Sequence, residues 1–561
     1  MKFLRLKSDF ILSFFGWSTG LSARKVRLAI TAFVFCLGYG LIIYKLCDIS
    51  FGYKNAEKKY AEKTSKIRRD IVDRNGNILA TNIPIASLYA NPKKIINVEE
   101  SIAKLATIYP NIEKERLLSE FKKDKTFVWV SRDLTPKIQD EIVALGLPGL
   151  YFEHEQKRVY TQGKATSHML GFVDRDNNGI SGIEKYFDKE LADQDKNGPL
   201  ELAVDYRVQN IVSQELDKVI EKFSALGGVG IVADARSGEV LAMVSKPDFD
   251  PHKTATASPD RLFNRASLGL YEIGSVVKAL TFAIAFDTNT INMHDVYNVG
   301  NFTINKFKVK DYHRHDGWNT VPQLFMNSSN IGAGMIMLEV GKKNFKEYMS
   351  KLSLTKALSL ELPEVATPKF PEEKRWGDLG LVTMSYGYGF SITPMHFVQG
   401  MIPVVNGGYK HDLTLLKKTE SEIKGVKIFE EETSINMLKL LRLTVEKGTG
   451  KKAGVKGYLV AGKTGTAEKL GPRGYLKNSR FSSFIATAPS INPRFVVFVF
   501  LDDPKGIKET FGFATGGFTA APVVGNIISR VGSLYGIQPF DEDDEDIKNM
   551  MHVDYEVENE V

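Results

Sequence analysis

The feature that most restricts the fold of this chain is an uncharged apolar segment near its N-terminus. Residues 28–44 read LAITAFVFCLGYGLIIY, seventeen residues without a charge. A helix of this length lies at the short end of what crosses a bilayer, and it exceeds most signal-peptide cores. No small-residue cleavage site follows it, because the next residues are Lys45, Leu46, Cys47 and Asp48. We therefore predict an uncleaved transmembrane anchor rather than a cleaved signal peptide or a buried helix.

Basic residues on the two sides of this segment do not decide its orientation by their number. Arg24, Lys25 and Arg27 precede it, but several lysines follow it. The tight cluster on the first side and the short tail before it favour an N-terminus inside the cell. Residues 1–27 are then a cytoplasmic tail, and the large C-terminal part is expected on the outer side.

The charge of the chain is unevenly distributed. The formal net charge is +7, yet residues 541–561 contain ten acidic residues against one lysine, so residues 1–540 carry about +16. A basic body suits an anionic polymer or a membrane surface as well as nucleic acid. Because no aromatic-interleaved basic motif or Cys/His finger is present, we do not expect nucleic acid as a partner.

The sequence also argues against disulfides and metal centres. The only cysteines, Cys36 and Cys47, lie in or beside the apolar segment, so the body of the chain has no disulfide framework and no cysteine metal site. Two runs, residues 174–179 and 193–198, begin like calcium-binding loops. The glutamate expected at the twelfth position is replaced by Lys185 and Val204, so we interpret both runs as turns.

Sequence patterning divides the rest of the chain into four parts. Residues 45–69 are charged at helical spacing and are typical of a stalk. Short strand-like runs alternate with turns up to about residue 202. Longer helices and apolar strands follow over residues 203–540, which we interpret as one α+β domain. The acidic residues 541–561 are expected to be disordered.

Three elements of the 203–540 region are predicted in more detail. Residues 229–232 and 239–244 flank the turn at residues 234–238 and predict a hairpin. Residues 275–287 have helical spacing. Residues 495–501 are a continuous apolar run and predict a buried strand.

The pattern Ser-x-x-Lys, which places a hydroxyl and an amine one helical turn apart, occurs six times. Only Ser275/Lys278 follows a turn, at residues 271–274, and opens an apolar run. A lysine in such a helix is desolvated, which lowers its pKa and makes it a usable base for the serine. The alternative interpretation is an N-cap serine followed by a lysine that extends to solvent.

Two further motifs follow in order along the chain. Ser328-Ser329-Asn330 comes after an apolar stretch, although Ser-x-Asn also occurs at Ser434 and Ser490. Lys463-Thr464-Gly465-Thr466 occurs once, on a predicted strand, where a lysine and two hydroxyls at a strand edge suit an extended substrate with a carboxylate. Three such motifs in this order are far more specific than any one of them.

Ser275-x-x-Lys278, Ser328-x-Asn330 and Lys463-Thr464-Gly465 resemble the three active-site motifs of penicillin-binding proteins and serine β-lactamases. Over about residues 68–540 the chain is similar to class B enzymes of the division-specific FtsI type. The segments that carry this likeness are residues 71–76, 182–184, 264–266, 271–275, 386–394, 446–450, 461–467 and 492–494. Asn330 stands where elongation-type relatives usually carry aspartate, which favours division. Ile273 replaces the usual proline, which is expected to shift the turn before Ser275 without removing it.

The resemblance implies an α+β fold in three parts. A single transmembrane helix, residues 28–44, precedes a stalk and an elongated, mostly-β pedestal domain of the dimerisation type, residues 45–202. A penicillin-binding transpeptidase domain follows at residues 203–540, with helices on both sides of an antiparallel sheet, as in β-lactamases. The implied reaction is acyl transfer from the D-Ala-D-Ala end of a peptidoglycan stem peptide, without cofactor or metal.

The resemblance also implies a role for each motif residue. Ser275 is the nucleophile, Lys278 its general base, and the N–H groups of Ser275 and Thr466 form the oxyanion hole. Ser328 and Lys463 pass the proton to the leaving amine, and Asn330 holds the substrate amide. Thr464 and Thr466, on either side of Gly465, bind the terminal carboxylate. An amine from a neighbouring stem peptide then resolves the acyl-enzyme, and β-lactams are expected to acylate Ser275 and stay bound.

Partners and alternatives complete the expectations. In the FtsI family the partners include the glycan polymerase FtsW and other division proteins. The resemblance also implies that this chain lies in the cytoplasmic membrane, with its catalytic domain outside. The alternatives are an elongation-type class B transpeptidase, a β-lactamase or β-lactam sensor, and a division scaffold without activity. The long segment between anchor and active-site domain argues against a lactamase or sensor, and the retention of all three motifs argues against a scaffold.

Overall fold

The structure is a computed structural model that describes residues 23–61, 67–193, 195–312 and 317–556. Residues 1–66 and 67–561 are separate compact units. In the first unit, α2 (Ala23–Ala61) includes a stretch, Arg27–Cys47, that is long and apolar enough to cross a membrane by length and composition. The predicted anchor at residues 28–44 lies within it. Most of the expected cytoplasmic tail lies outside the described residues.

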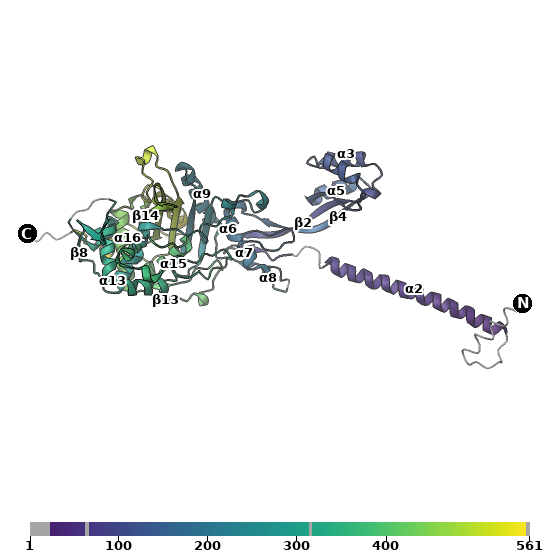
Figure 1. Ribbon diagram of the computed structural model, residues 1–561, viewed down its shortest axis with the longest axis horizontal. Coiled ribbons are helices and arrows are strands. Elements are labelled where there is room, and N and C mark those ends of the chain that lie inside the picture. Colours follow the sequence, from purple (N-terminus) through teal and green to yellow (C-terminus); the bar gives the residue numbers. More distant parts are fainter. Residues whose placement is uncertain (1–22, 62–66, 194, 313–316, 557–561) are drawn as a thin grey trace, which may run out of the picture. The chain divides into compact units, whose positions relative to one another are not determined.

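The second unit begins with a five-stranded sheet (Figure 1). The 13-residue strand β2 (Ile78–Ala90) is its centre, with β4 (Leu150–Tyr160) antiparallel along one edge. The other edge pairs with β3 (Val128–Leu134) and β1 (Ile71–Val72), and β5 (Leu200–Glu201) runs parallel to β1. Three helices pack on the β3 end and form a separate apolar core: α3 (Val98–Ile108), α4 (Lys114–Phe121) and α5 (Pro136–Ala144).

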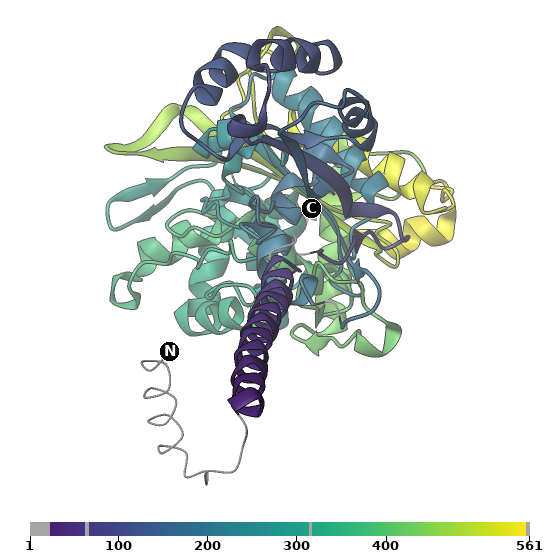
Figure 2. The same cartoon turned by 90° about the vertical axis from the view of Figure 1, so that its right-hand side faces the viewer.

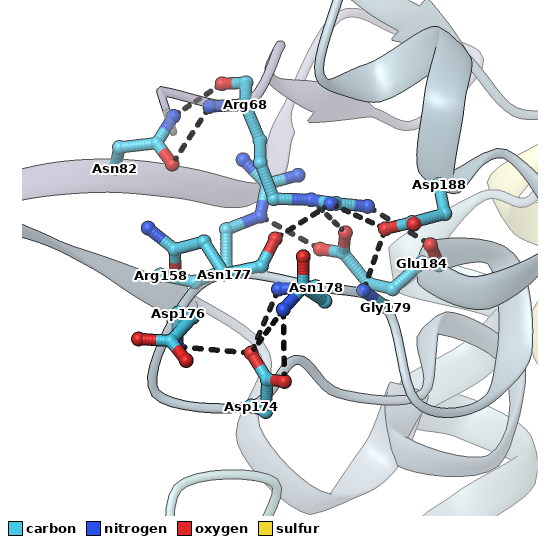
Figure 3. A network of polar contacts seen from close by, with 10 residues as sticks. All are labelled: Arg68, Asn82, Arg158, Asp174, Asp176, Asn177, Asn178, Gly179, Glu184 and Asp188. Atoms are coloured by element: carbon cyan, nitrogen blue, oxygen red, sulfur yellow. Dashed lines mark hydrogen bonds and ion pairs between the residues drawn. The ribbon is translucent and has the colours of Figure 1, made fainter. Parts of the chain in front are cut away.

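A buried network of charges ties the start of this unit to its sheet (Figure 3). The Arg68 guanidinium donates to Glu184 Oε2 and to Asp188 Oδ1, each at 2.8 Å. Arg158, on β4, donates to the other Glu184 oxygen at 2.7 Å. The side chains of Arg68, Arg158 and Glu184 are fully excluded from solvent. Glu184, with Asp188 as a second partner of Arg68, therefore compensates two cations that would be very costly to bury alone.

Short helices and a turn surround this network: α6 (Ser167–Leu170), α7 (Gly182–Tyr186) and α8 (Asp188–Leu191). The run at residues 174–179, which we expected to be a turn, forms one. Asp174 Oδ1 accepts hydrogen bonds from the backbone N–H groups of Asp176 at 2.9 Å and Asn178 at 2.8 Å (Figure 3). The carboxylate thus stabilises its own loop.

A second five-stranded sheet, antiparallel throughout, forms the core of the C-terminal region. Its order is β14 (Ala461–Gly471), β15 (Gly474–Ala488), β16 (Phe495–Asp502), β6 (Gly227–Asp234) and β7 (Val240–Lys246). In Figure 2 the yellow-green β14–β15 hairpin projects from the body of this region. β16 explains the layering: Phe495, Val497 and Val499 face one apolar cluster, while Val496 and Phe498 face the other.

Helices cover both faces of this sheet, as the predicted fold class requires. On one face lie α9 (Tyr206–Lys222) and α17 (Ala520–Leu534). On the other lie α11 (Lys278–Asp287), α13 (Asn330–Lys351), α15 (Pro394–Val405) and α16 (Glu431–Glu446). Shorter elements are α10 (Pro259–Leu262), α12 (Val321–Met326), α14 (Asp378–Ser385), and the strand pairs β8 (Val296–Asn298) with β11 (Trp318–Thr320), β9 (Phe302–Ile304) with β10 (Phe307–Val309), and β12 (Tyr409–Lys410) with β13 (Val426–Lys427).

The predicted local elements are confirmed with small differences. The expected hairpin is β6–β7, and the expected buried strand is β16. The predicted helix at residues 275–287 begins as the 3₁₀ turn η4 (Gly274–Val277) and continues as α11.

The expectation that residues 541–561 are disordered is wrong for residues 541–556. Residues 545–551 form helix α18 (Glu545–Met551), and Met551 packs against the main apolar core. Glu542 forms an ion pair of 2.8 Å with the buried Arg442 of α16 and accepts a 2.6 Å hydrogen bond from Gly457 N. These tertiary contacts outweigh an acidic composition that by itself favours disorder.

Candidate active site

Ser275 lies in η4, directly before α11. Gly274, which precedes it, has a φ of +65°, and a Cβ there would come within 2.6 Å of the Thr466 carbonyl oxygen on β14. Glycine is the residue that suits both conditions. The turn therefore packs its backbone directly on β14, with Ser275 partly exposed beside buried neighbours.

Lys278, one helical turn after Ser275, is fully buried. Its Nζ lies 3.0 Å from Ser275 Oγ and 3.2 Å from Ser328 Oγ. It donates to the Ser328 carbonyl oxygen and to Asn330 Oδ1, each at 2.7 Å. The interpretation of Lys278 as a solvent-extended lysine is therefore wrong, and Ser275 makes no capping hydrogen bond for the helix.

These contacts fix how the amine is oriented. A neutral amine has two N–H donors and one lone pair. Because the Ser328 carbonyl and Asn330 Oδ1 can only accept, they occupy the two donors, and the lone pair is left facing the serine hydroxyls. Lys278 is thus arranged to accept the proton of Ser275.

The protonation state of Lys278 agrees with this arrangement. Burial lowers the pKa of Lys278 to about 7, and the carboxylate of Asp311 opposes that fall. Near neutral pH a large fraction of the amine is uncharged, which a general base requires.

Ser328 and Asn330 lie in the junction between α12 and α13. Ser328 has a left-handed backbone with φ of +60°, an uncommon conformation for a residue with a side chain. Ser329 is the N-cap of α13, where its Oγ accepts a 2.9 Å hydrogen bond from Gly332 N. The reversal between the helices directs both Ser328 Oγ and Asn330 Oδ1 to Lys278.

The third predicted motif lies on β14 beside the nucleophile turn. A Cβ at Gly465 would meet Val276 Cγ1 at 2.8 Å, so the missing side chain permits this close approach. Thr464 Oγ1 lies 2.7 Å from Thr449 Oγ1, and Thr466 Oγ1 accepts from Gly516 N at 3.2 Å. The strand that carries these two hydroxyls therefore packs against the turn that contains Ser275.

Lys463 is fully buried, and its Nζ lies 5.6 Å from the centre of the Phe325 ring. Among the described residues its Nζ has no hydrogen-bond partner. Burial, and then the nearby Lys278, hold the pKa of Lys463 well below its usual value. The structure thus brings a second desolvated lysine toward the first, although no direct hydrogen bond joins Lys463 to Ser328 among the described residues.

Sequence reasoning missed Asp311, in the loop after β10. Its carboxylate accepts from Ser329 Oγ at 2.7 Å, Asn330 N at 2.5 Å and Ile331 N at 3.0 Å. No spacing rule points to this residue, because a loop remote in sequence supplies a contact that only the fold creates.

The assembled groups suit nucleophilic acyl transfer. A partly exposed serine hydroxyl adjoins a lysine whose lone pair and pKa suit proton abstraction. A second lysine of low pKa and two hydroxyls line the adjoining strand. Six of the eight predicted site residues lie in contact with one another or with the turn that contains Ser275, at the distances given above. The other two, Lys463 and Thr464, lie on β14.

Comparison with known proteins gives a consistent result. Residues 228–529 match the family model of the penicillin binding protein transpeptidase domain, and residues 63–218 match that of the penicillin-binding protein dimerisation domain. The chain is 37% identical over 498 residues to the probable peptidoglycan D,D-transpeptidase FtsI of Caulobacter vibrioides, with 85% of this chain and 83% of the relative covered.

A second relative and one solved structure extend the comparison. The peptidoglycan D,D-transpeptidase FtsI of Escherichia coli K12 is 30% identical over 511 residues, with 85% of each chain covered. The crystal structure of penicillin binding protein 3 from Mycobacterium tuberculosis, complexed with aztreonam, superposes with a TM-score of 0.68 at 22% identity. The superposition covers 85% of this chain and 98% of the mycobacterial chain, and it supports the same fold.

Proposed function

This chain belongs to the FtsI-type class B penicillin-binding proteins, and from that premise we propose that it cross-links the stem peptides of septal peptidoglycan through an acyl-enzyme on Ser275. The observation that carries the proposal is the position of Lys278 Nζ, 3.0 Å from Ser275 Oγ, with its two donors occupied by Ser328 and Asn330. The enzyme is a serine-type D,D-transpeptidase.

In the acylation step, Ser275 Oγ attacks the carbonyl carbon of the penultimate D-Ala while Lys278 takes the serine proton. The backbone N–H groups of Ser275 and Thr466 stabilise the oxyanion. The bond to the terminal D-Ala nitrogen then breaks. Ser328 and Lys463 deliver the proton to that leaving amine, and the terminal D-Ala departs.

In the second step, the amine of a neighbouring stem peptide attacks the acyl carbon. The ester bond to Ser275 breaks, the new amide is the cross-link, and the proton from the acceptor amine returns to Ser275. Asn330 holds the amide of the donor peptide. Before acylation, Thr464 and Thr466 bind the carboxylate of the terminal D-Ala, which leaves with that residue, and Gly465 between them leaves space for the strand to lie against the turn.

We propose the same acylation by β-lactams, whose leaving group stays attached and blocks the second step. The apolar helix α2, long enough to cross a membrane, and the likeness to FtsI proteins support a single-pass protein of the cytoplasmic membrane. The proposed substrate requires the N-terminus inside and the catalytic domain outside. An FtsW-type glycan polymerase and other division proteins are the proposed partners.

The test is covalent labelling of the full-length chain in detergent with a fluorescent penicillin, followed by peptide mapping. We expect a stable adduct on Ser275. Ser275→Ala and Lys278→Ala should abolish labelling without unfolding the protein. Ser421→Ala is the matched control, because it removes the serine from an exposed copy of the same Ser-x-x-Lys pattern.

Each other outcome has a definite meaning. An adduct that is released rapidly would favour a β-lactamase. No adduct on folded protein, also with its polymerase partner present, would favour a scaffold without activity. Normal labelling of either alanine variant in the Ser275–Lys278 pair would contradict the mechanism.

A further inference from the structure

We propose that Asp311 is a positioning residue for the acylation reaction, because its carboxylate fixes Asn330 against Lys278 and supplies a negative charge to the surroundings of the general base. The inference rests on the proposed function and adds a residue to its machinery. Among the described residues, the Asp311 carboxylate accepts hydrogen bonds from Ser329, Asn330 and Ile331 and not from Ser275, so it acts through its neighbours.

Hydrogen bonds to the Asp311 carboxylate hold the start of α13 in place. Asp311 Oδ1 accepts from the N–H groups of Asn330 and Ile331, and Oδ2 accepts from Ser329 Oγ. One carboxylate therefore holds three consecutive residues at the start of α13. Hydrogen bonds to an ionised acceptor are stronger than neutral ones. They stabilise the junction that contains Ser328 in its unfavourable left-handed conformation.

The neighbouring residue of Asp311 fixes which way the Asn330 amide faces. Asn330 Nδ2 donates to the Lys310 carbonyl oxygen at 2.9 Å. With the amide nitrogen bound there, Oδ1 faces Lys278 Nζ at 2.7 Å. The two residues Lys310 and Asp311 thus hold the backbone and the side chain of Asn330, and Asn330 in turn occupies one donor of Lys278.

The charge of Asp311 also acts on Lys278. The hydrogen-bonding neighbours of Lys278 are neutral oxygens, so they leave its charge uncompensated. In the described part of the chain, the carboxylate of Asp311 is the charge that acts on this amine, and it favours the protonated form. Removing the charge of Asp311 therefore shifts the balance of Lys278 further toward the free amine.

Two substitutions separate the geometric contribution from the charge. Asp311→Asn keeps an oxygen that accepts from Asn330 N and Ile331 N and a group that pairs with Ser329 Oγ, but it removes the charge. Asp311→Ala removes both. Asp295→Asn is the control, because it removes a carboxylate from a turn nearby in sequence, where Asp295 accepts from Asn292 N at 2.8 Å.

The measurement is the second-order rate constant of penicillin acylation of the full-length chain between pH 5 and 9. Asp311→Asn should move the acidic limb of the profile to lower pH by about 0.5–1 unit, because the charge that favours protonated Lys278 is gone. Asp311→Ala should lower the maximal rate by about 10- to 100-fold, the usual effect of a small misplacement at a catalytic centre. Asp295→Asn should leave both unchanged.

A purely structural role would lower the amount of folded protein without moving the limb. If the Asp311→Asn profile coincides with that of the unmodified chain, the electrostatic part of the inference is wrong. If Asp311→Ala, folded by circular dichroism, acylates within twofold of the unmodified chain, the positioning role is wrong. Should the unmodified chain fail to acylate, the proposed function fails, and NMR titration of ¹³C-labelled Lys278 in both proteins still decides whether Asp311 acts on that amine.

Discussion

Lys278 has to remain a base although hydrogen-bond acceptors surround it. Those acceptors stabilise its protonated form, whereas burial stabilises its neutral form. Burial is the larger effect, and the pKa of Lys278 falls to about 7. The site thus operates close to the point where the two forms are equally populated.

This balance predicts the pH dependence of acylation. The rate constant for penicillin acylation should rise about tenfold per pH unit below pH 7 and level off above it, because neutral Lys278 is the active form above its pKa and is lost as the pH falls. Stopped-flow fluorescence with a labelled penicillin measures it, with circular dichroism at each pH as the control for folding. A rate that still rises beyond pH 9 would show that Lys278 keeps an ordinary lysine pKa.

The turn before the nucleophile gives a second prediction at this scale. Gly274→Ala should lower the acylation rate by at least about tenfold. An alanine there is strained at φ +65°, and its Cβ would lie 2.6 Å from the Thr466 carbonyl, so Ser275 would be displaced from Lys278. Gly536→Ala is the matched control, since Gly536 has a similar φ of +64° but open space around its Cβ. Equal acylation rates for the two variants would contradict the argument.

Residues of the site differ in how far sequence could predict them. Ser275 and Lys278 were predictable because a turn and an apolar run surround them, and apolar context implies the burial that makes lysine a base. Asp311 was not predictable, since its contacts depend on how the loop after β10 folds onto the start of α13. The absence of a hydrogen-bond partner for Lys463 in the described structure likewise follows from tertiary packing.

At the scale of elements, hydrophobic periodicity and turn residues were sufficient to predict the helices and strands whose surroundings are uniform along their length. The β6–β7 hairpin and the doubly buried strand β16 follow from alternation and from an uninterrupted apolar run. The boundary that we propose between the two domains, at residues 202 and 203, lies between β5 and α9. α9 packs on β6 and β7, which supports its assignment to the second domain.

The buried network at the base of the first sheet supplies the prediction at this scale. Glu184→Gln should lower the free energy of unfolding by about 3–5 kcal/mol, because Arg68 and Arg158 would remain buried without the carboxylate that they share. Urea denaturation of the full-length chain measures this difference. Glu373→Gln is the control, because it removes one partner of an exposed pair with Lys346, and such pairs contribute about 0–1 kcal/mol. Similar losses in the two variants would contradict the role assigned to burial.

At the scale of the whole molecule, the C-terminal segment shows where composition misleads. Its acidic residues predict disorder, but a few specific contacts suffice to order it. Glu542 pairs with Arg442, and Thr320 Oγ1 donates to the Tyr555 carbonyl at 2.9 Å. Thr320 is the N-cap of α12, the helix that leads to Ser328. The last described residues therefore contact the start of the helix that leads to Ser328.

The segment also reaches the strand that carries the third motif. Arg442, held by Glu542, donates through Nη1 to the carbonyl of Val460 at 3.2 Å, one residue before β14 begins. Without Glu542 the buried guanidinium of Arg442 loses its ion-pair partner in this segment. Its hydrogen bond to the Val460 carbonyl is then held less firmly. The C-terminal segment thus stabilises the start of the strand on which Lys463 lies.

Truncation after Phe540 tests this function. We expect the free energy of unfolding to fall by about 1–3 kcal/mol, the cost of leaving a buried polar group unsatisfied, and penicillin acylation of Ser275 to slow as α12 and β14 lose their contacts with the segment. Glu542→Gln should reproduce part of the loss in stability, because it removes the charge that pairs with Arg442. Truncation after Glu556 is the matched control, since it keeps every described contact of the segment. If both truncated proteins unfold and acylate like the full chain, residues 541–556 are a passive extension. If only the longer truncation is impaired, the acidic segment is part of the folded catalytic domain.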